Sequence, residues 1–119
     1  MTEVFVFGSN LAGRHGAGAA LYARMKYRAE YGVGRGRTGD AYAIPTKDAD
    51  LRSLPLAEIE VECAAFARYA AEHHDELFLL TPIGCGLAGN DPRAIAAIFR
   101  RVVLPFNVRL HNSWMEHFA

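Results

Sequence analysis

Two glycine-rich loops constrain the fold of this chain more than any other feature. The first, residues 8–18 (GSNLAGRHGAG), lies between the apolar run 4–7 (VFVF) and an alanine-rich segment. The second, residues 84–90 (GCGLAGN), lies between the apolar run 77–80 (LFLL) and a helix start at Asp91-Pro92. Glycines at such junctions let backbone N–H groups approach a ligand, and the N-terminus of the next helix adds partial positive charge. Two such loops facing each other would form a phosphate clamp with room for a diphosphate.

The size and charge of the chain predict one small domain that spans residues 1–119. Thirteen basic residues balance thirteen acidic ones, so we expect no general attraction to nucleic acid or to a membrane surface. Cys63 and Cys85 are too few for a disulfide scaffold and are expected to be reduced thiols. No run approaches the roughly 18 apolar residues of a membrane span. These features predict a cytoplasmic protein without a membrane partner.

Four apolar runs are predicted strands, at residues 4–7, 41–44, 77–80 and 108–110, and Pro45 is expected to end the second. Residues 32–39 hold four glycines and are predicted to be either a mobile loop over a ligand or a flexible connection. With a helix between every pair of strands, the order βαβαβαβ predicts a parallel sheet covered on both faces. Ligands of such sheets bind at the carboxyl ends of the strands, where both glycine loops lie.

The three segments between these strands are predicted helices. Residues 17–30 are rich in alanine, and Leu21, Met25 and Arg28 recur at helical spacing. Pro55 suits the first turn of a helix that reaches to about residue 72, and Asp91 with Pro92 suits the start of the third. The residues predicted to face the core from the second and third helices are Ile59, Cys63, Phe66, Ala70, Ile95, Ile98, Phe99 and Val102.

Several polar residues near the predicted strand ends allow two interpretations each. Asn10 either caps a turn or bonds to a ribose hydroxyl, and His15 is either a solvated residue or a ligand contact. Cys85 is either a nucleophile near a helix N-terminus or a small residue chosen for close packing. Lys47 and Asp48 either form a solvated pair or offer one phosphate contact or one acid–base group at the ligand face. Trp114 either stacks on a purine or covers the end of the core.

Known motifs exclude some nucleotide-binding classes. The first loop lacks the Gly-Lys-Ser/Thr of a Walker A motif, and its glycine spacing differs from the dinucleotide fingerprint. No His, Cys, Asp and Glu cluster has metal-ligand spacing, so no metal and no cofactor are expected.

The two loops with their strands resemble those of macro domains. Residues 5–10 (FVFGSN) and 13–20 (GRHGAGAA) resemble the first ligand loop of that family, in which a strand ends in asparagine and a glycine triplet opens a helix. Residues 42–46 (YAIPT) are similar to the next long strand, and residues 81–89 (TPIGCGLAG) to the second phosphate loop. The resemblance covers about residues 4–112, and the whole chain is similar to short macro-domain-like proteins of bacteria and their phages.

This resemblance implies a three-layer α/β/α fold, with a mostly parallel four-stranded sheet of order 4-3-1-2 and helices on both faces. It also implies an ADP-ribose site, in which Asn10 contacts the distal ribose and the two loops wrap the diphosphate. The ligand-binding residues implied are Gly8, Ser9, Asn10, Gly13, Gly16, Ala17, Gly18, Ile83, Gly84, Cys85, Gly86, Leu87, Ala88 and Gly89.

The chain departs from the family pattern at two places. Hydrolytic macro domains often carry an aspartate shortly after the glycines, where this chain has Ala17, Ala19 and Ala20. Asn10, His15 and Asp48 are then the candidates to assist catalysis. The family segment that precedes the asparagine strand usually supplies an acidic residue for adenine, and Trp114 is the candidate substitute here.

Three functions are therefore considered. The first is binding of ADP-ribose or a close derivative, with possible hydrolysis of ADP-ribosylated protein, ADP-ribosylated nucleic acid or ADP-ribose phosphate. The second is a non-catalytic module that senses or sequesters such a metabolite. The third is a different nucleotide-binding domain that shares only the loops.

Overall fold

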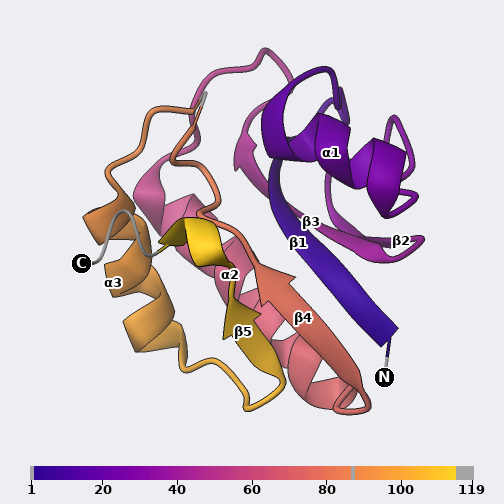
Figure 1. Cartoon of the computed structure of the whole chain (residues 1–119). Coiled ribbons are helices and arrows are strands. Elements are labelled where there is room, and N and C mark those ends of the chain that lie inside the picture. Colours follow the sequence, from indigo (N-terminus) through magenta and orange to yellow (C-terminus); the bar gives the residue numbers. More distant parts are fainter. Residues whose placement is uncertain (1, 87, 115–119) are drawn as a thin grey trace.

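The computed structural model describes residues 2–86 and 88–114, and in this part of the chain three helices pack on a five-stranded sheet (Figure 1). The strands lie in the order β2-β3-β1-β4-β5. The elements are β1 (Thr2–Asn10), α1 (Gly18–Lys26), β2 (Gly36–Thr38), β3 (Ala41–Lys47), α2 (Leu56–Glu72), β4 (Glu76–Leu80), α3 (Pro92–Val102), β5 (Val108–Leu110) and the 3₁₀ helix η1 (Asn112–Trp114).

The four strands expected from the sequence are parallel neighbours in the expected order. β1 pairs with β3 and β4, and β4 pairs with β5. The prediction of a four-stranded parallel sheet with a helix between every two strands is wrong, because β2 adds a fifth strand antiparallel to β3. Gly39, with φ of +54°, lies in the tight turn between them. Part of the glycine-rich segment therefore forms an edge strand and not a loop.

Pro45 does not end β3, which continues to Lys47. Pro45 lies opposite Ser9, and the pairing of β1 with β3 shifts register between Ser9 and Asn10. Proline has no N–H to donate, and such an irregularity is where a strand accommodates it. The longer strand carries Thr46 and Lys47 to the carboxyl edge of the sheet.

The two faces of the sheet carry different residues because side chains alternate along a strand. In β1, Val4 and Val6 pack on the side of α2 and α3. Phe5 and Phe7 pack on the opposite side, with Ala23 of α1. The structure is thus three-layered, with α1 on one face and α2 and α3 on the other (Figure 1).

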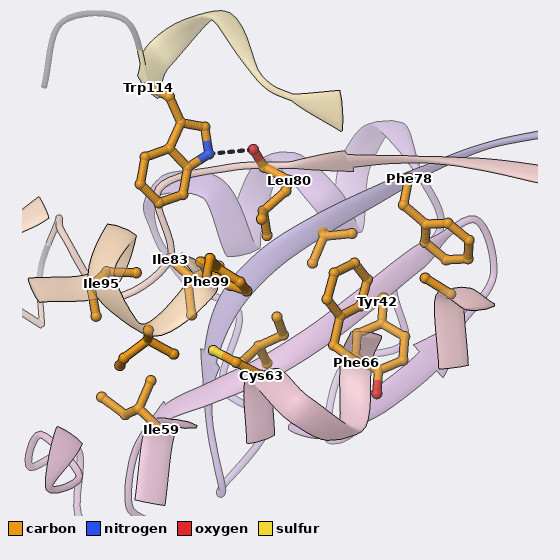
Figure 2. Close-up of a cluster of buried hydrophobic side chains, with 14 of the residues drawn as sticks. Tyr42, Ile59, Cys63, Phe66, Phe78, Leu80, Ile83, Ile95, Phe99 and Trp114 are labelled. Carbon is orange, nitrogen blue, oxygen red and sulfur yellow. Dashed lines mark hydrogen bonds between the residues drawn. The ribbon is translucent and has the colours of Figure 1, made fainter. Parts of the chain in front are cut away.

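The larger core lies between the sheet and α2 with α3. The predicted α2 stripe, Ile59, Cys63, Phe66 and Ala70, is completely buried. Figure 2 shows Phe66, Tyr42 and Phe78 grouped at one end of this core, and Trp114 covering the other. The Trp114 indole N–H donates a hydrogen bond to the Leu80 carbonyl at 2.5 Å.

Helix α1 differs most from its prediction. It begins at Gly18 and ends at Lys26, and its buried residue is Ala23. Met25, one of the residues that recur at helical spacing in the sequence, is 71% exposed. Helix α1 packs over the small Ala41 and Ala43 of β3, which leave room for Ala23 and let the helix approach the strand closely. Arg28, with φ of +60°, then turns the chain away from the helix.

Candidate functional site

A cleft of about 1030 Å³ lies at the carboxyl ends of the parallel strands. It runs between the first loop with the N-terminus of α1 and the loop that joins β4 to α3. Of the predicted ligand-binding residues, those that line it are Gly8, Ser9, Asn10, Gly16, Ala17, Gly18, Ile83, Gly84, Cys85, Gly86 and Ala88. Leu87 lies outside the described residues. The structure thus brings both glycine-rich loops to one cavity.

The N-terminus of α1 opens into this cleft without a cap. Its N-cap residue, Ala17, has no side chain that can accept a hydrogen bond, and the first turn holds no acidic residue. Among the described residues, the N–H groups of Gly16, Ala17 and Gly18 find no hydrogen-bond partner. By contrast, the Asp91 carboxylate caps α3 by accepting from the Arg93 N–H at 2.9 Å. Helix α1 therefore presents free donors and positive dipole charge to a bound anion.

The second loop approaches the first through glycine backbone. A Cβ atom on Gly8 would lie 2.9 Å from the Gly84 nitrogen, so a side chain there would collide with the other loop. Gly84 itself has φ of +70°, and a Cβ on it would lie 2.9 Å from Nδ2 of Asn90. The Gly84 carbonyl accepts from the Asn90 backbone N–H at 2.9 Å and from its side chain at 3.0 Å. These bonds hold the loop shape, while a Cβ on Gly86 would meet no atom within 4 Å.

Asn10 closes the first loop and also lines the cleft. Its Nδ2 donates to the Arg14 carbonyl at 2.9 Å, and its Oδ1 accepts from the Arg14 N–H at 3.0 Å. This is the turn-capping interaction that the sequence allowed. The side-chain amide has two N–H donors, and only one is used by Arg14. The second donor leaves Asn10 able to bond to a ligand while it holds the loop.

His15 and Asp48, two of the predicted catalytic residues, do not line the cleft. His15 is completely buried, with its ring edge-on to Phe7 at 5.2 Å and to Tyr31 at 6.1 Å. Burial lowers the pKa of His15, and the Val33 backbone offsets this in part. Neither ring nitrogen has a close hydrogen-bond partner among the described residues. A buried neutral imidazole of this kind is a core residue.

The Asp48 carboxylate holds a turn next to the cleft. Its Oδ1 accepts hydrogen bonds from the N–H groups of Asp50, at 2.9 Å, and Arg52, at 3.0 Å. The side chain thus satisfies backbone donors of its own loop. This position suits a structural role and gives no support for acid–base chemistry.

Gly13, Gly89 and Trp114 also lie away from the cleft lining. A Cβ on Gly13 would lie 2.2 Å from the backbone carbon of Gly32, so this glycine permits the contact between two loops. Trp114 packs edge-on against Phe99 at 6.3 Å within the core. Its position matches the core-covering interpretation and not a purine stack.

The Cys85 thiol lines the cleft but is not activated. Burial, with a smaller contribution from the charge of Asp91, raises the pKa of the Cys85 thiol to about 11. Its Sγ lies 3.4 Å from the Ile83 carbonyl. The thiol is therefore neutral near pH 7, which favours the packing interpretation over the nucleophile.

An aromatic end of the cleft was missed by the sequence reasoning. Phe5, Tyr22 and His111 line it, with the Phe5 ring 5.2 Å from Tyr22 and 6.3 Å from His111. The His111 Nδ1 accepts from the Ser113 N–H at 3.2 Å and lies 2.9 Å from the Ser113 hydroxyl oxygen, and these contacts hold the ring in place. His111 directly follows the last predicted strand, and this carboxyl-end position was the signal that could have found it.

The charged side chains that line the cleft are all positive among the described residues. Among its described lining residues, Arg14 and Lys47 are the charged ones, and none is an aspartate or glutamate. Within the described residues, no group of three or more His, Cys, Asp or Glu side chains could hold a metal ion. In the same part of the chain, no helix is long and apolar enough to cross a membrane. The positive lining of the cleft favours an anionic ligand.

Comparisons with known proteins bear on the fold. No protein-family model matches the chain, and no curated protein does. A protein of unknown function from Bacteroides thetaiotaomicron has a similar structure, with a TM-score of 0.63, 16% identity, and coverage of 92% of this chain and 87% of that one. The macrodomain of Mycobacterium tuberculosis DarG aligns with a TM-score of 0.58, 20% identity, and coverage of 92% and 86%. The chain thus has a macro-domain-like mixed α/β fold.

Proposed function

We propose that this chain binds ADP-ribose, or a close derivative with the same ribose-diphosphate group, in the cleft. The observation that carries the proposal is the uncapped N-terminus of α1, which faces the second glycine loop across a cavity free of described acidic residues. A diphosphate supplies the negative charge and the acceptor oxygens that such donors require. The macro-domain-like fold supports the same class of ligand.

The geometry suggests how the ligand would lie. The diphosphate would contact the N–H groups of Gly16, Ala17 and Gly18 on one side and those of the second loop on the other. Asn10 would bind the distal ribose. Phe5 is five residues earlier in β1, which places the two about 16 Å apart along the strand. We therefore place the adenine at the aromatic end, against Tyr22 and His111, in place of the predicted Trp114.

Binding without catalysis is the form of this proposal that the cleft favours. Hydrolysis of an ADP-ribosyl bond requires a group that activates water. His15 is buried in the core, Asp48 is bonded to its own turn, and no described carboxylate lines the cleft. The hydrolase alternative is tested by incubating the protein with ADP-ribosylated protein, ADP-ribosylated nucleic acid and ADP-ribose phosphate. Release of ADP-ribose or phosphate at a steady turnover would show that the protein is an enzyme.

Titration calorimetry with ADP-ribose tests the binding itself, with NAD, AMP and ATP as comparison ligands. Affinity near micromolar would correspond to about −8 kcal/mol. We expect ADP-ribose to bind more tightly than AMP, because AMP lacks the groups that reach Asn10. Clear binding of another nucleotide, with no heat from millimolar ADP-ribose, would contradict the proposal and favour a different nucleotide-binding domain.

A further inference from the structure

A second cavity, of about 310 Å³, lies between α3, η1 and the strand β5 at the edge of the sheet. The described residues that line it are Ala96, Phe99, Arg100, Leu104, Leu110 and Trp114. Figure 2 shows two of them, Phe99 and Trp114, at the same end of the core. None of the six lines the cleft described above. This cavity, the α3–β5 groove, is thus a mainly apolar surface that the proposed function does not use.

The segment that joins α3 to β5 exposes large apolar side chains beside the groove. Phe106 is 83% exposed and Val103 is 74% exposed, more than any other large apolar side chain that the structure describes. Leu110, which lines the groove, is 54% exposed. Exposed apolar side chains that gather next to an apolar groove are typical of a surface that contacts another protein.

The backbone that carries Phe106 is firmly held. The next residue, Asn107, is buried, and its own carbonyl accepts from the Phe78 N–H at 2.9 Å. Its Nδ2 lies 2.9 to 3.1 Å from three carbonyl oxygens, those of Ala70, His73 and Glu76. Because this backbone is already ordered, a partner that packs on Phe106 would cost little further conformational entropy. An exposed aromatic ring on a fixed backbone is well suited to anchor an interface.

Val103 follows the last turn of α3 with φ of +60°, a conformation that β-branched residues rarely adopt. Glycine or asparagine would suit such a position at the end of a helix. The stability of the helix end therefore gives no reason for an exposed valine here, whereas a contact surface does.

The groove and its border carry positive charge. Within the described lining and residues 103–110, the charged residues are Arg100 and Arg109, and both are exposed. Neither forms a salt bridge with a described residue, whereas Arg101 on the same helix pairs with Glu60. In a symmetric contact a second copy would bring the same cations to the same interface. The charge therefore favours a different partner, one with acidic groups.

We propose that the α3–β5 groove binds a peptide segment of another protein, in which large apolar side chains lie next to Asp or Glu. The apolar side chains fill the groove and pack on Phe106, and the carboxylates pair with Arg100 and Arg109. Since the groove and the cleft share no described lining residue, the partner leaves the cleft open. The proposal does not depend on the ligand of the cleft.

Selection of short random peptides displayed on phage, with the full chain as bait, tests the proposal. We expect the enriched peptides to hold large apolar residues and an excess of Asp and Glu over Lys and Arg. Their affinity is then measured by fluorescence polarisation. The double variant Phe106→Ser/Leu110→Thr should weaken binding at least about tenfold, because it removes the apolar anchors. Arg100→Glu should weaken it about tenfold at low salt, and this difference should shrink as salt rises.

Val61→Ser provides the matched control, because Val61 is a 67% exposed apolar residue on α2 that lines neither cavity. It should keep the wild-type affinity for the selected peptides. Melting curves measured by circular dichroism show whether each variant is folded, and all substituted side chains are exposed in the wild type.

Three results would overturn the proposal: selection of no peptide, selected peptides without an acidic excess, or an affinity that survives in the double variant. Light scattering on the full chain tests the other occupant. A doubled mass that returns to that of one chain in the double variant would assign the surface to a second copy instead. ADP-ribose titrations are separate from all these measurements, so failure of one proposal leaves the other standing.

Discussion

Polar side chains of the first loop bond to the backbone of that loop and of the segment 32–39. Asn10 spans the backbone of Arg14, and Ser9 donates its hydroxyl proton to the Gly34 carbonyl. Such bonds hold a glycine-rich segment in one shape and leave its N–H groups free to face a ligand. A single residue, such as Asn10, can therefore both hold the loop in shape and contact the ligand.

Asn10 is expected to affect both stability and binding. Asn10→Ala removes two part-buried hydrogen bonds, so we expect the free energy of unfolding to fall by about 1–3 kcal/mol. Urea denaturation measures this change. The affinity for ADP-ribose should also fall by roughly tenfold or more, because the loop loosens and a ribose contact is lost. Unchanged affinity in the folded variant would mean that Asn10 only closes the loop.

His15 is expected to make the fold sensitive to acid. Burial lowers its pKa in the folded state, so below the ordinary value of 6.5 the unfolded chain binds a proton that the folded chain resists. The stability from His15 is fully present above pH 6.5 and is lost as the pH falls from there towards its folded pKa. Denaturant midpoints measured from pH 7.5 to 5.5 should fall less for His15→Phe or His15→Leu than for the wild type. Equal pH dependence in all three proteins would place the titration elsewhere.

Elements that bury a full stripe of hydrophobic side chains were predictable from the sequence. Elements that bury few side chains were not. The α2 stripe and the Asp91-Pro92 start of α3 match their predictions because periodicity and capping chemistry are local signals. β2 has three half-buried residues at a sheet edge, and α1 buries only Ala23. With so little apolar burial, tertiary contacts decide these two elements, and the sequence carries no strong pattern for them.

A side chain at Gly86 in the second loop should allow the protein to fold but prevent it from binding the ligand. A Cβ at this position meets no atom within 4 Å, so Gly86→Val is expected to fold with nearly wild-type stability. The valine would project where the ligand approaches the backbone, and ADP-ribose binding should be lost in calorimetry. Cys85→Ser is the neighbouring control and should largely keep affinity. Near-native binding by folded Gly86→Val would remove the second loop from the diphosphate site.

At the scale of the whole molecule, the topology brings together segments that are far apart in the sequence. The carboxyl ends of parallel strands share one edge, so the sequence could place both glycine loops at a common site. It could not place His15 in the core or Trp114 under Leu80, since those positions depend on how loops fold back. The pairing of Lys47 with Asn10 likewise depends on strand register, which no local pattern fixes.

The whole fold should be stabilised by its ligand, because the proposed site joins elements from both halves of the chain. At about 100 times the dissociation constant, ADP-ribose should add about 2.7 kcal/mol to the free energy of unfolding. For a chain of this size, this corresponds to a rise in melting temperature of roughly 10 °C, measured by thermal scanning. AMP at the same concentration should give a smaller rise, and Gly86→Val should give none with either. Since N–H groups, Arg14 and Lys47 supply the local positive charge of a neutral protein, the rise should diminish with added salt. An equal rise with every nucleotide, independent of salt, would point to binding that does not use the two loops.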